Sequence, residues 1–415
     1  MNIFTIIKSQ TSQFRIFNTN ARKLILANFL YGLFNPFYLI FSNTYIFSST
    51  KGNITFNLIY CLFTFIGIIS GFIINGYLLR YIHVKKQIIV GSLLMFVSIV
   101  VMFMLPSGTL TGIWIFVFGL ATGIGNGIYW SSRNYLTLVN TNDSNRNFFA
   151  GIDYILISIG RIITPLLIGL YIGEGIKHSW YNQQFAYRSS LIFAFAILVL
   201  MTLTILPRKY KTIRAKRFLY WNYSKQWNKA RFMVFNLAFF QGLFLALPAI
   251  LIMKYVGNES AVGSINSISY LVAIVVVYFV SRNAQVKDRT KILKCASILL
   301  LFGTICFSIF LNFNSLIATI ILLVLIFISE PILNFPFRAS FMKVIDEVKK
   351  KEKRDDYAYV VDIELFTAFG RVLSLGLFFA LYKLLPIIYS LPIYMLAVAG
   401  IQFLNIRLSK EINGI

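Results

Sequence analysis

The feature that most limits the fold of this chain is a series of long apolar stretches separated by short polar links. By our reading there are twelve, at about residues 24–46, 55–79, 87–105, 110–132, 148–172, 189–207, 232–254, 261–281, 292–311, 315–337, 358–382 and 386–406. A hydrocarbon core of about 30 Å needs about 20 apolar residues in helical form. Strands of a membrane barrel would be about ten residues long and would alternate in polarity, whereas residues 320–328 are continuously apolar. We therefore predict an all-α membrane protein.

The charge of the chain fits the same fold. The formal net charge is +25, which alone would suggest a nucleic-acid partner, but 58% of the residues are hydrophobic and only 13% are charged. The lysines and arginines lie between the apolar stretches. With the N-terminus placed inside, 32 of the 39 basic residues fall on the cytoplasmic side and five fall outside. The asymmetry predicts an even number of helices, both termini in the cytoplasm, and membrane lipid, not nucleic acid, as a partner.

Other residue types predict no metal or cofactor. The three cysteines, Cys61, Cys295 and Cys306, lack metal-type spacing, and both histidines stand alone in links. The first apolar stretch is too long for the core of a signal peptide, so we expect it to be retained as the first helix. Nothing resembles a phosphate-binding loop, a catalytic triad or a pair of hydrolytic carboxylates. We expect a protein that is not an enzyme and draws its energy from a solute or ion gradient.

The longest link divides the chain into two halves. We predict an N-terminal six-helix bundle over residues 1–206, a basic cytoplasmic linker over 207–231, and a C-terminal six-helix bundle with a short tail over 232–415. Tyrosines and tryptophans are interleaved with the basic residues of the linker, a composition suited to an anionic headgroup surface. We interpret this linker as a determinant of topology and a membrane anchor.

The halves also resemble each other in sequence. Residues 31–34 read YGLF and residues 241–244 read QGLF, and the pair Gly160-Arg161 recurs as Gly370-Arg371, both at an offset of 210. A duplicated six-helix unit with an axis along the membrane normal is the architecture that alternating-access carriers use to expose a central site to each side. The repeat therefore predicts transport.

With this architecture, the chain resembles the major facilitator superfamily over its whole length. Residues 160–169 resemble a glycine- and proline-rich pattern of the family's antiporters, with Gly160, Pro165 and Gly169 in place and Thr164 and Ile168 where the pattern has glycines. The link from 288 to 291 resembles the family's gating motif and keeps Asp288 and Arg289, which implies a gating charge network. Residues 129–169 are also similar to uncharacterised bacterial permeases of the superfamily.

Ionisable residues inside the spans are candidate functional groups, because a central arginine costs about 3 kcal/mol on insertion scales. Arg161 and Arg371 both lie near the middle of their helices, and two guanidiniums facing a cavity would form a clamp for carboxylate or phosphate. Structural pairing with Asp153, Asp362 or Glu364 on the same helices is an equally good interpretation. Glu330, next to Pro331, is our candidate for proton coupling, and the alternative is a salt bridge to either arginine.

The resemblance implies that helices 1, 4, 7 and 10 line the cavity. Their polar and aromatic residues are then candidate substrate contacts, although hydrogen bonds between helices would account for many of them. They are Asn28, Tyr31, Asn35, Asn126, Tyr129, Trp130, Asn236, Gln241 and Asn334.

The sequence thus predicts a secondary transporter, a symporter or antiporter in the cytoplasmic membrane, whose substrate is a small organic or phosphorylated anion. The coupling ion would be a proton. A proton-coupled exporter of amphiphilic compounds or drugs is the alternative, and it would depend more on Glu330 than on the arginines. A third possibility is a sensor or assembly partner that kept the fold without transporting.

Overall fold

The computed structural model describes residues 17–106, 108–141, 146–210, 217–283 and 288–413, and the regular structure in these ranges is helical. Within these ranges, twelve spans are long and apolar enough to cross a membrane, which confirms the predicted number. The first span consists of α2 (Thr19–Pro36), the π-helix η1 (Phe37–Phe41) and α3 (Ser42–Ser49). The others are α4 (Ile54–Leu78), α5 (Val84–Met104), α6 (Gly112–Asn140), α7 (Arg146–Lys177), α8 (Gln183–Ile205), α9 (Lys225–Tyr255), α10 (Glu259–Asn283), α11 (Arg289–Phe310), α12 (Ser315–Glu352), α13 (Asp356–Leu384) and α14 (Ile387–Asn413).

The π-helical turn in the first span follows from Pro36. Proline has no N–H to donate within the helix, and its ring crowds the carbonyl of the preceding turn. The backbone widens over Phe37–Phe41 and then returns to α-helix. The Phe37 carbonyl accepts both the backbone N–H of Ser42 and its Oγ–H, the latter at 2.9 Å, which fixes the end of the π-helical turn. Such π-turns are frequent at functional sites, and this one lies between Asn35 and Asn43, which both line the central cavity.

Several helices extend past the ends that hydrophobicity predicts. Ser224 caps α9, with its Oγ accepting from Trp227 N at 3.4 Å, so this helix begins at Lys225 and not at residue 232. The predicted linker boundary at residue 231 is therefore wrong, because residues 225–231 are helical. Likewise α12 continues to Glu352, well past the predicted end at residue 337. An apolar run marks only the part of a helix suited to lipid, whereas backbone hydrogen bonding and caps decide where it ends.

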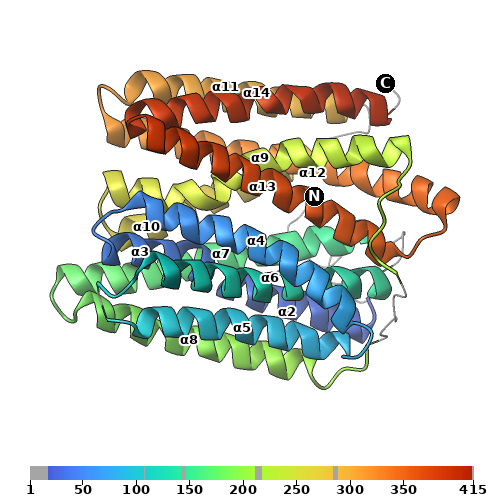
Figure 1. Ribbon diagram of the computed structural model, residues 1–415, viewed down its shortest axis with the longest axis horizontal. Coiled ribbons are helices and arrows are strands. Elements are labelled where there is room, and N and C mark those ends of the chain that lie inside the picture. Colours follow the sequence, from blue (N-terminus) through green and yellow to red (C-terminus); the bar gives the residue numbers. More distant parts are fainter. Residues whose placement is uncertain (1–16, 107, 142–145, 211–216, 284–287, 414–415) are drawn as a thin grey trace, which may run out of the picture.

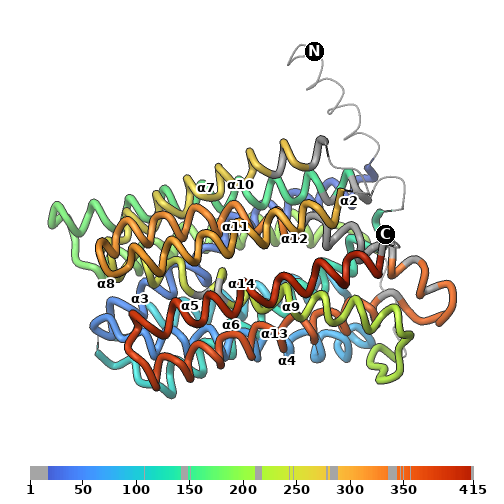
Figure 2. Tube along the Cα trace, turned by 90° about the horizontal axis from the view of Figure 1, so that it is seen from above, coloured from blue at the N-terminus to red at the C-terminus, as the bar shows by residue number. Residues whose placement is uncertain are grey.

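The helices form two sets that meet along two seams. In Figure 1, α2–α8 fill the lower part of the molecule, and α9 with α11–α14 fill the upper part. Helix α7 packs on α10 at one side, and α4 packs on α13 at the other, as Figure 2 shows. Helices from both halves therefore surround the space between them.

Glycines allow the closest helix contacts. A Cβ added to Gly160 of α7 would lie 2.5 Å from the carbonyl carbon of Gly32 in α2, and one added to Gly169 would lie 2.7 Å from Cα of Gly263 in α10. Small residues let backbones approach in this way. The first contact lies within one half and the second joins the two halves.

The linker and the first turn of α9 contact both halves. Lys85 Nζ donates to the carbonyls of Leu206 and Arg208 at 2.8 and 3.1 Å. On the other side, the Arg354 guanidinium lies 4.5 Å from the ring centre of Tyr220. Trp227, predicted to lie at the headgroup surface, is buried instead and donates its Nε1–H to Asp362 at 2.6 Å. We call the end of the molecule that holds residues 217–224 the linker end.

Candidate functional site

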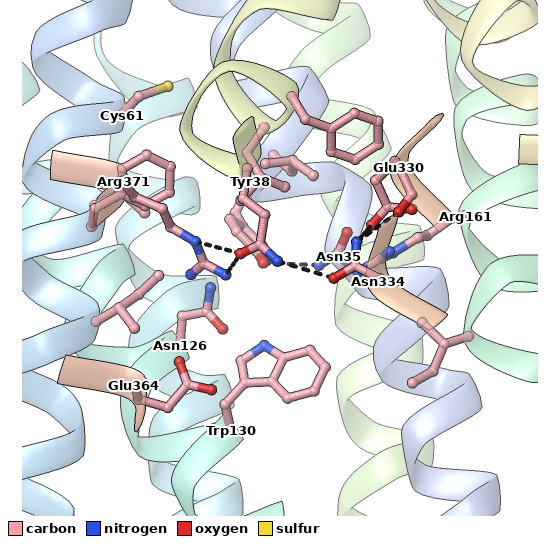
Figure 3. A pocket seen from close by; sticks show the side chains of 18 of the residues that line it. Asn35, Tyr38, Cys61, Asn126, Trp130, Arg161, Glu330, Asn334, Glu364 and Arg371 are labelled. Carbon is pink, nitrogen blue, oxygen red and sulfur yellow. Dashed lines mark hydrogen bonds between the residues drawn. The ribbon is translucent and has the colours of Figure 1, made fainter. Parts of the chain in front are cut away.

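A cavity of about 220 Å³ lies between the halves. It is lined from η1 and the helices on either side of it, from α4, α6 and α7, and from α9, α12 and α13. Eight residues singled out from the sequence as binding or coupling groups line it: Asn35, Asn126, Trp130, Arg161, Gln241, Glu330, Asn334 and Arg371. Figure 3 shows Arg371 on one side of this cavity and Arg161 with Glu330 on the other.

The side chain of Arg371 is held by Gln241, the first residue of the repeated segment 241–244. Its Nε and one terminal nitrogen donate to Oε1 of Gln241 at 3.1 and 2.6 Å. The backbone explains this meeting, because Gly242 packs on the Arg371 carbonyl, where an added Cβ would lie 3.1 Å away. The partner is a neutral amide, so the positive charge of Arg371 is not cancelled by this contact.

Arg161 occupies the equivalent place in the first half but lacks the equivalent contact. Its guanidinium carbon lies 5.8 Å from the ring centre of Tyr270, and Glu330 is within electrostatic range. The Nε atom is buried and has no hydrogen-bond partner among the described residues. A buried N–H donor of a charged group without an acceptor is costly, so this atom is a candidate for contact with a ligand or water.

A chain of hydrogen bonds connects Arg371 to Glu330. Gln241 Nε2 donates to Asn334 Oδ1 at 3.3 Å, and Asn334 Nδ2 donates to Glu330 Oε1 at 2.9 Å. The chain runs across α13, α9 and α12 and is visible in Figure 3. Residues far apart in the sequence are thus joined at one wall of the cavity.

Two of the acids proposed as structural partners of these arginines pair elsewhere. Asp153 forms an ion pair with Arg133, and its side chain is 4% exposed. Asp362 forms one with Arg231 at 2.5 Å. Neither Arg161 nor Arg371 forms an ion pair in the part of the chain that the structure describes. The interpretation in which Asp153 and Asp362 neutralise the two arginines is therefore wrong.

Tyr31 and Tyr129, predicted as substrate contacts, are not among the described residues that line the cavity. Their rings stack with centres 3.9 Å apart. The Tyr31 hydroxyl accepts from Trp130 Nε1 at 2.9 Å and donates to Asn126 Oδ1 at 2.9 Å. The pair therefore fixes the side chains that do reach the cavity. The sequence alone does not distinguish an aromatic residue that stacks on another side chain from one that contacts a ligand.

Sequence reasoning did not name several polar cavity residues as binding groups, among them Arg133, Asp153, Glu364 and Tyr38. Arg133 lies just past the predicted end of the fourth apolar stretch at residue 132, Asp153 and Glu364 were considered only as structural partners, and Tyr38 stands in an apolar run. The length of α6, which continues to Asn140, brings Arg133 into the span. Tyr38 faces the cavity because of the π-helical turn, which the sequence signals only through Pro36.

The predicted gating residues lie outside the cavity lining. Pro165 and Gly169 pack against Gly263 in the seam between α7 and α10. Asp288 directly precedes α11 and Arg289 begins it, away from the cavity, and whether they form a gating network stays a prediction.

Contacts between the halves occur beyond both ends of the cavity. Toward the linker end, the Tyr357 hydroxyl of α13 lies 2.5 Å from Ser131 Oγ of α6. At the opposite end, the carboxylate of Glu259, the first residue of α10, accepts from the Tyr187 hydroxyl of α8 at 3.1 Å. Glu259 is 6% exposed. The two halves therefore meet at each end of the space between them.

Within the described residues, no group of three or more histidine, cysteine, aspartate or glutamate side chains is arranged to hold a metal ion. The buried Cys61 does line the cavity. The polar groups of the site are mainly guanidinium, carboxylate, amide and phenol groups, set among aliphatic and aromatic side chains.

Twelve apolar helices around a central polar cavity define a multi-pass membrane transport protein. The family model of the Major Facilitator Superfamily matches residues 24–356, and the chain belongs to this superfamily. An uncharacterised protein, YqgE of Bacillus subtilis (strain 168), is 28% identical over 288 residues, which are 68% of this chain and 64% of that protein. The chain therefore spans less than two thirds of the length of that relative.

Solved transporter structures share the fold at low sequence identity. A bacterial homologue of the iron transporter ferroportin in an inward-facing state has a TM-score of 0.68 and 14% identity, covering 95% of this chain and 99% of that one. The nucleoside transporter NupG has a TM-score of 0.64 and 15% identity, covering 95% of this chain and all of the other. A bacterial metal transporter has a TM-score of 0.63 and 13% identity, covering 96% and 100%. These similarities establish the architecture.

Proposed function

We propose that this protein is a secondary transporter that carries a small organic or phosphorylated anion across a bacterial cytoplasmic membrane, together with protons, by alternating access. The observation that carries the proposal is the state of the two cavity arginines. One engages a neutral amide and the other has a buried N–H donor without a partner, so both keep positive charge available to a ligand. Guanidinium groups in this state suit carboxylate or phosphate oxygens.

Charge balance supports coupling to a proton. Among the residues that the structure describes, three arginines and three carboxylates line the cavity, namely Arg133, Arg161, Arg371, Asp153, Glu330 and Glu364. With all six ionised, their formal charges cancel. A bound monoanion would add one negative charge inside a medium of low dielectric, which is costly. Protonation of Glu330, which lies within electrostatic range of Arg161, would restore neutrality.

The contacts at the two ends support alternating access. Opening the cavity toward the linker end requires loss of the contact between Tyr357 and Ser131, and opening it the other way requires loss of the contact between Glu259 and Tyr187. The six-helix halves would be the moving units, and the seams at α7–α10 and α4–α13 would be the surfaces on which they rock. The concentration of basic residues toward the linker end favours a cytoplasmic location for that end.

The cavity is less suited to the alternative of a drug or amphiphile exporter. Pockets for drug-sized ligands are about 300–1,000 Å³ and carry only a few polar groups. The volume of about 220 Å³ and the six charged side chains at the wall fit a smaller, polar solute. Arg161 and Arg371 form no ion pair within the described residues and would repel a free divalent cation, which argues against transferring the substrates of the structurally similar metal transporters to this cavity.

A ligand screen with charge-neutralising variants tests the proposal. The apparent melting temperature of the purified protein is measured with malate, succinate, lactate, inorganic phosphate and tetraphenylphosphonium. A native-state ligand at about 100 times its dissociation constant adds about 2.7 kcal/mol. We expect anions to stabilise the wild type and the control Arg407→Gln, whose arginine side chain is 86% exposed, but not Arg161→Gln or Arg371→Gln.

Stabilisation by the lipophilic cation alone, or by anions in both cavity variants, would reject the anion carrier and favour the exporter. Coupling is tested in proteoliposomes that exchange a bound anion. Glu330→Gln should keep anion exchange and lose accumulation driven by a pH gradient. Unchanged accumulation would assign coupling to another group. A sensor without transport activity would show ligand binding but no exchange in the wild type.

A further inference from the structure

Three residues that line the cavity each carry a buried side-chain atom without a hydrogen-bond partner among the described residues, namely Arg133 Nε, Arg161 Nε and Asn35 Oδ1. The two nitrogens are donors, and Arg133 already forms an ion pair with Asp153. Arg161 Nε and Asn35 Oδ1 are therefore a donor and an acceptor that both lack a partner. Asn35 is 2% exposed. Unpaired buried groups of this kind are rare in folded proteins, and each calls for a ligand or water.

The packing of α2 on α7 brings these two residues to the same part of the wall. Gly160, next to Arg161, touches the backbone of Gly32, one turn before Asn35. Thr164 Oγ1 also donates to the Leu33 carbonyl at 2.8 Å, which fixes the same two turns. Figure 3 shows Asn35 on the same side of the cavity as Arg161, with Arg371 on the other side.

The hydrogen bonds of Tyr31 and Tyr38 decide which atom of the Asn35 amide is left without a partner. The Tyr31 hydroxyl donates its proton to Asn126 Oδ1. In the contact of 3.2 Å between the two tyrosine hydroxyls, Tyr38 must therefore be the donor. Tyr38 then has no second proton and must accept from Asn35 Nδ2, which lies 2.8 Å away. The Asn35 amide is thereby oriented with Oδ1 left unpartnered.

We propose that the substrate is a hydroxylated anion, whose negative oxygen binds Arg161 and whose hydroxyl group donates to Asn35 Oδ1. This inference rests on the anion carrier proposed above and narrows its substrate class. Arg371, already occupied by Gln241, would give longer-range charge attraction, while Arg161 and Asn35 would form the direct subsite. A plain carboxylate satisfies Arg161 but leaves the Asn35 oxygen unpaired.

The experiment compares pairs of anions that differ only in a hydroxyl group. The pairs are L-lactate with propionate, L-malate with succinate, and hydroxyethyl phosphate with ethyl phosphate. Binding is measured by calorimetry on the purified full chain. Leaving a buried polar group unpaired costs about 1–3 kcal/mol, so the wild type should bind the hydroxylated member of its preferred pair about tenfold more tightly, or better.

Two variants test whether the preference for the hydroxylated anion depends on Asn35. Asn35→Leu should bring the ratio of affinities close to one, mainly by weakening the hydroxylated anion. The matched control is Asn266→Leu, since Asn266 is an equally buried asparagine of α10 that does not line the cavity, and it should keep the ratio. If Asn35→Leu does not fold, the affinity ratio of the wild type still decides.

The outcomes separate this inference from the proposed function. Equal binding of both members of every pair that binds, or an unchanged ratio in folded Asn35→Leu, overturns the hydroxyl assignment and leaves the anion carrier standing. Failure of every anion to bind overturns both. Preference for the hydroxylated member that is lost only in Asn35→Leu supports the assignment.

Discussion

Replacing Asp153 by asparagine removes the charge that pairs with Arg133 but keeps the shape of the side chain. The Arg133 and Asp153 side chains are 14% and 4% exposed, and Asn28 Nδ2 also donates to Asp153 Oδ1 at 2.6 Å. Breaking a buried ion pair by neutralising one partner typically costs 3–5 kcal/mol, because the other charge stays buried. We expect Asp153→Asn to lose about that much stability.

The double variant Asp153→Asn/Arg133→Gln should recover most of this loss. It removes both charges and leaves two amides that can hydrogen-bond to each other, and replacing a whole buried pair by neutral groups is often close to neutral in stability. The same logic predicts that Arg133→Gln alone is destabilised. A non-additive cycle of this kind is the signature of residues in direct contact.

The assay is the apparent melting temperature in detergent at a fixed heating rate, because membrane proteins of this size commonly unfold irreversibly. The control is Arg407→Gln at the exposed pair with Glu411, where the arginine side chain is 86% exposed, and it should change the melting temperature little. A double variant whose melting temperature falls by the sum of the two single changes would refute the reasoning, since it would show that the two charges do not compensate each other.

Two further predictions concern helix packing and the contact between the halves. Gly160→Ala places a Cβ 2.5 Å from the Gly32 backbone and should cost about 1–3 kcal/mol, whereas Gly376→Ala, with nothing within 4 Å of its added Cβ, should be neutral or slightly stabilising in a thermal melt. Equal effects would contradict the close contact of α2 and α7. Tyr357→Phe keeps the ring but removes the hydroxyl that meets Ser131, so it should favour opening at the linker end, seen as faster thiol labelling of an introduced cavity cysteine from that side. An unchanged labelling rate would show that this contact does not limit opening.

The number of membrane-spanning helices could be predicted from the sequence because the lipid environment allows few backbone structures. An apolar run of sufficient length must be a helix in which the backbone satisfies its own hydrogen bonds. The twelve spans followed directly, but their ends did not. The start of α9 at Lys225 depends on the Ser224 cap, and the extension of α6 to Asn140 carries Arg133 into the space between the halves. Hydropathy does not detect either feature.

The candidate site was accessible in part, for a related reason. Charges such as Arg161, Arg371 and Glu330 stand out in apolar runs because burying them is expensive, and all three line the cavity. Their partners could not be deduced, since pairing depends on which helices meet. The connection from Arg371 through Gln241 and Asn334 to Glu330 crosses three helices. The position of Tyr38 in the cavity wall depends on the π-helical turn that follows Pro36, which the sequence does not predict.

The difference between the two arginines originates in one position of the repeat. Each follows a glycine and lies near the middle of its helix, so nothing in the local sequence separates Arg161 from Arg371. The repeat places Tyr31 where the second half has Gln241. The amide oxygen of Gln241 accepts two N–H groups from Arg371, whereas the hydroxyl of Tyr31 is engaged with Asn126 and Trp130. The guanidinium of Arg161 is therefore left with a free donor on the side of the cavity where Asn35 has a free acceptor. Of the two repeated arginines, Arg371 is thus held by Gln241, and Arg161 keeps a donor without a partner among the described residues. Under our proposal, only an asymmetric substrate, with an acceptor and a donor in different places, would use both free atoms.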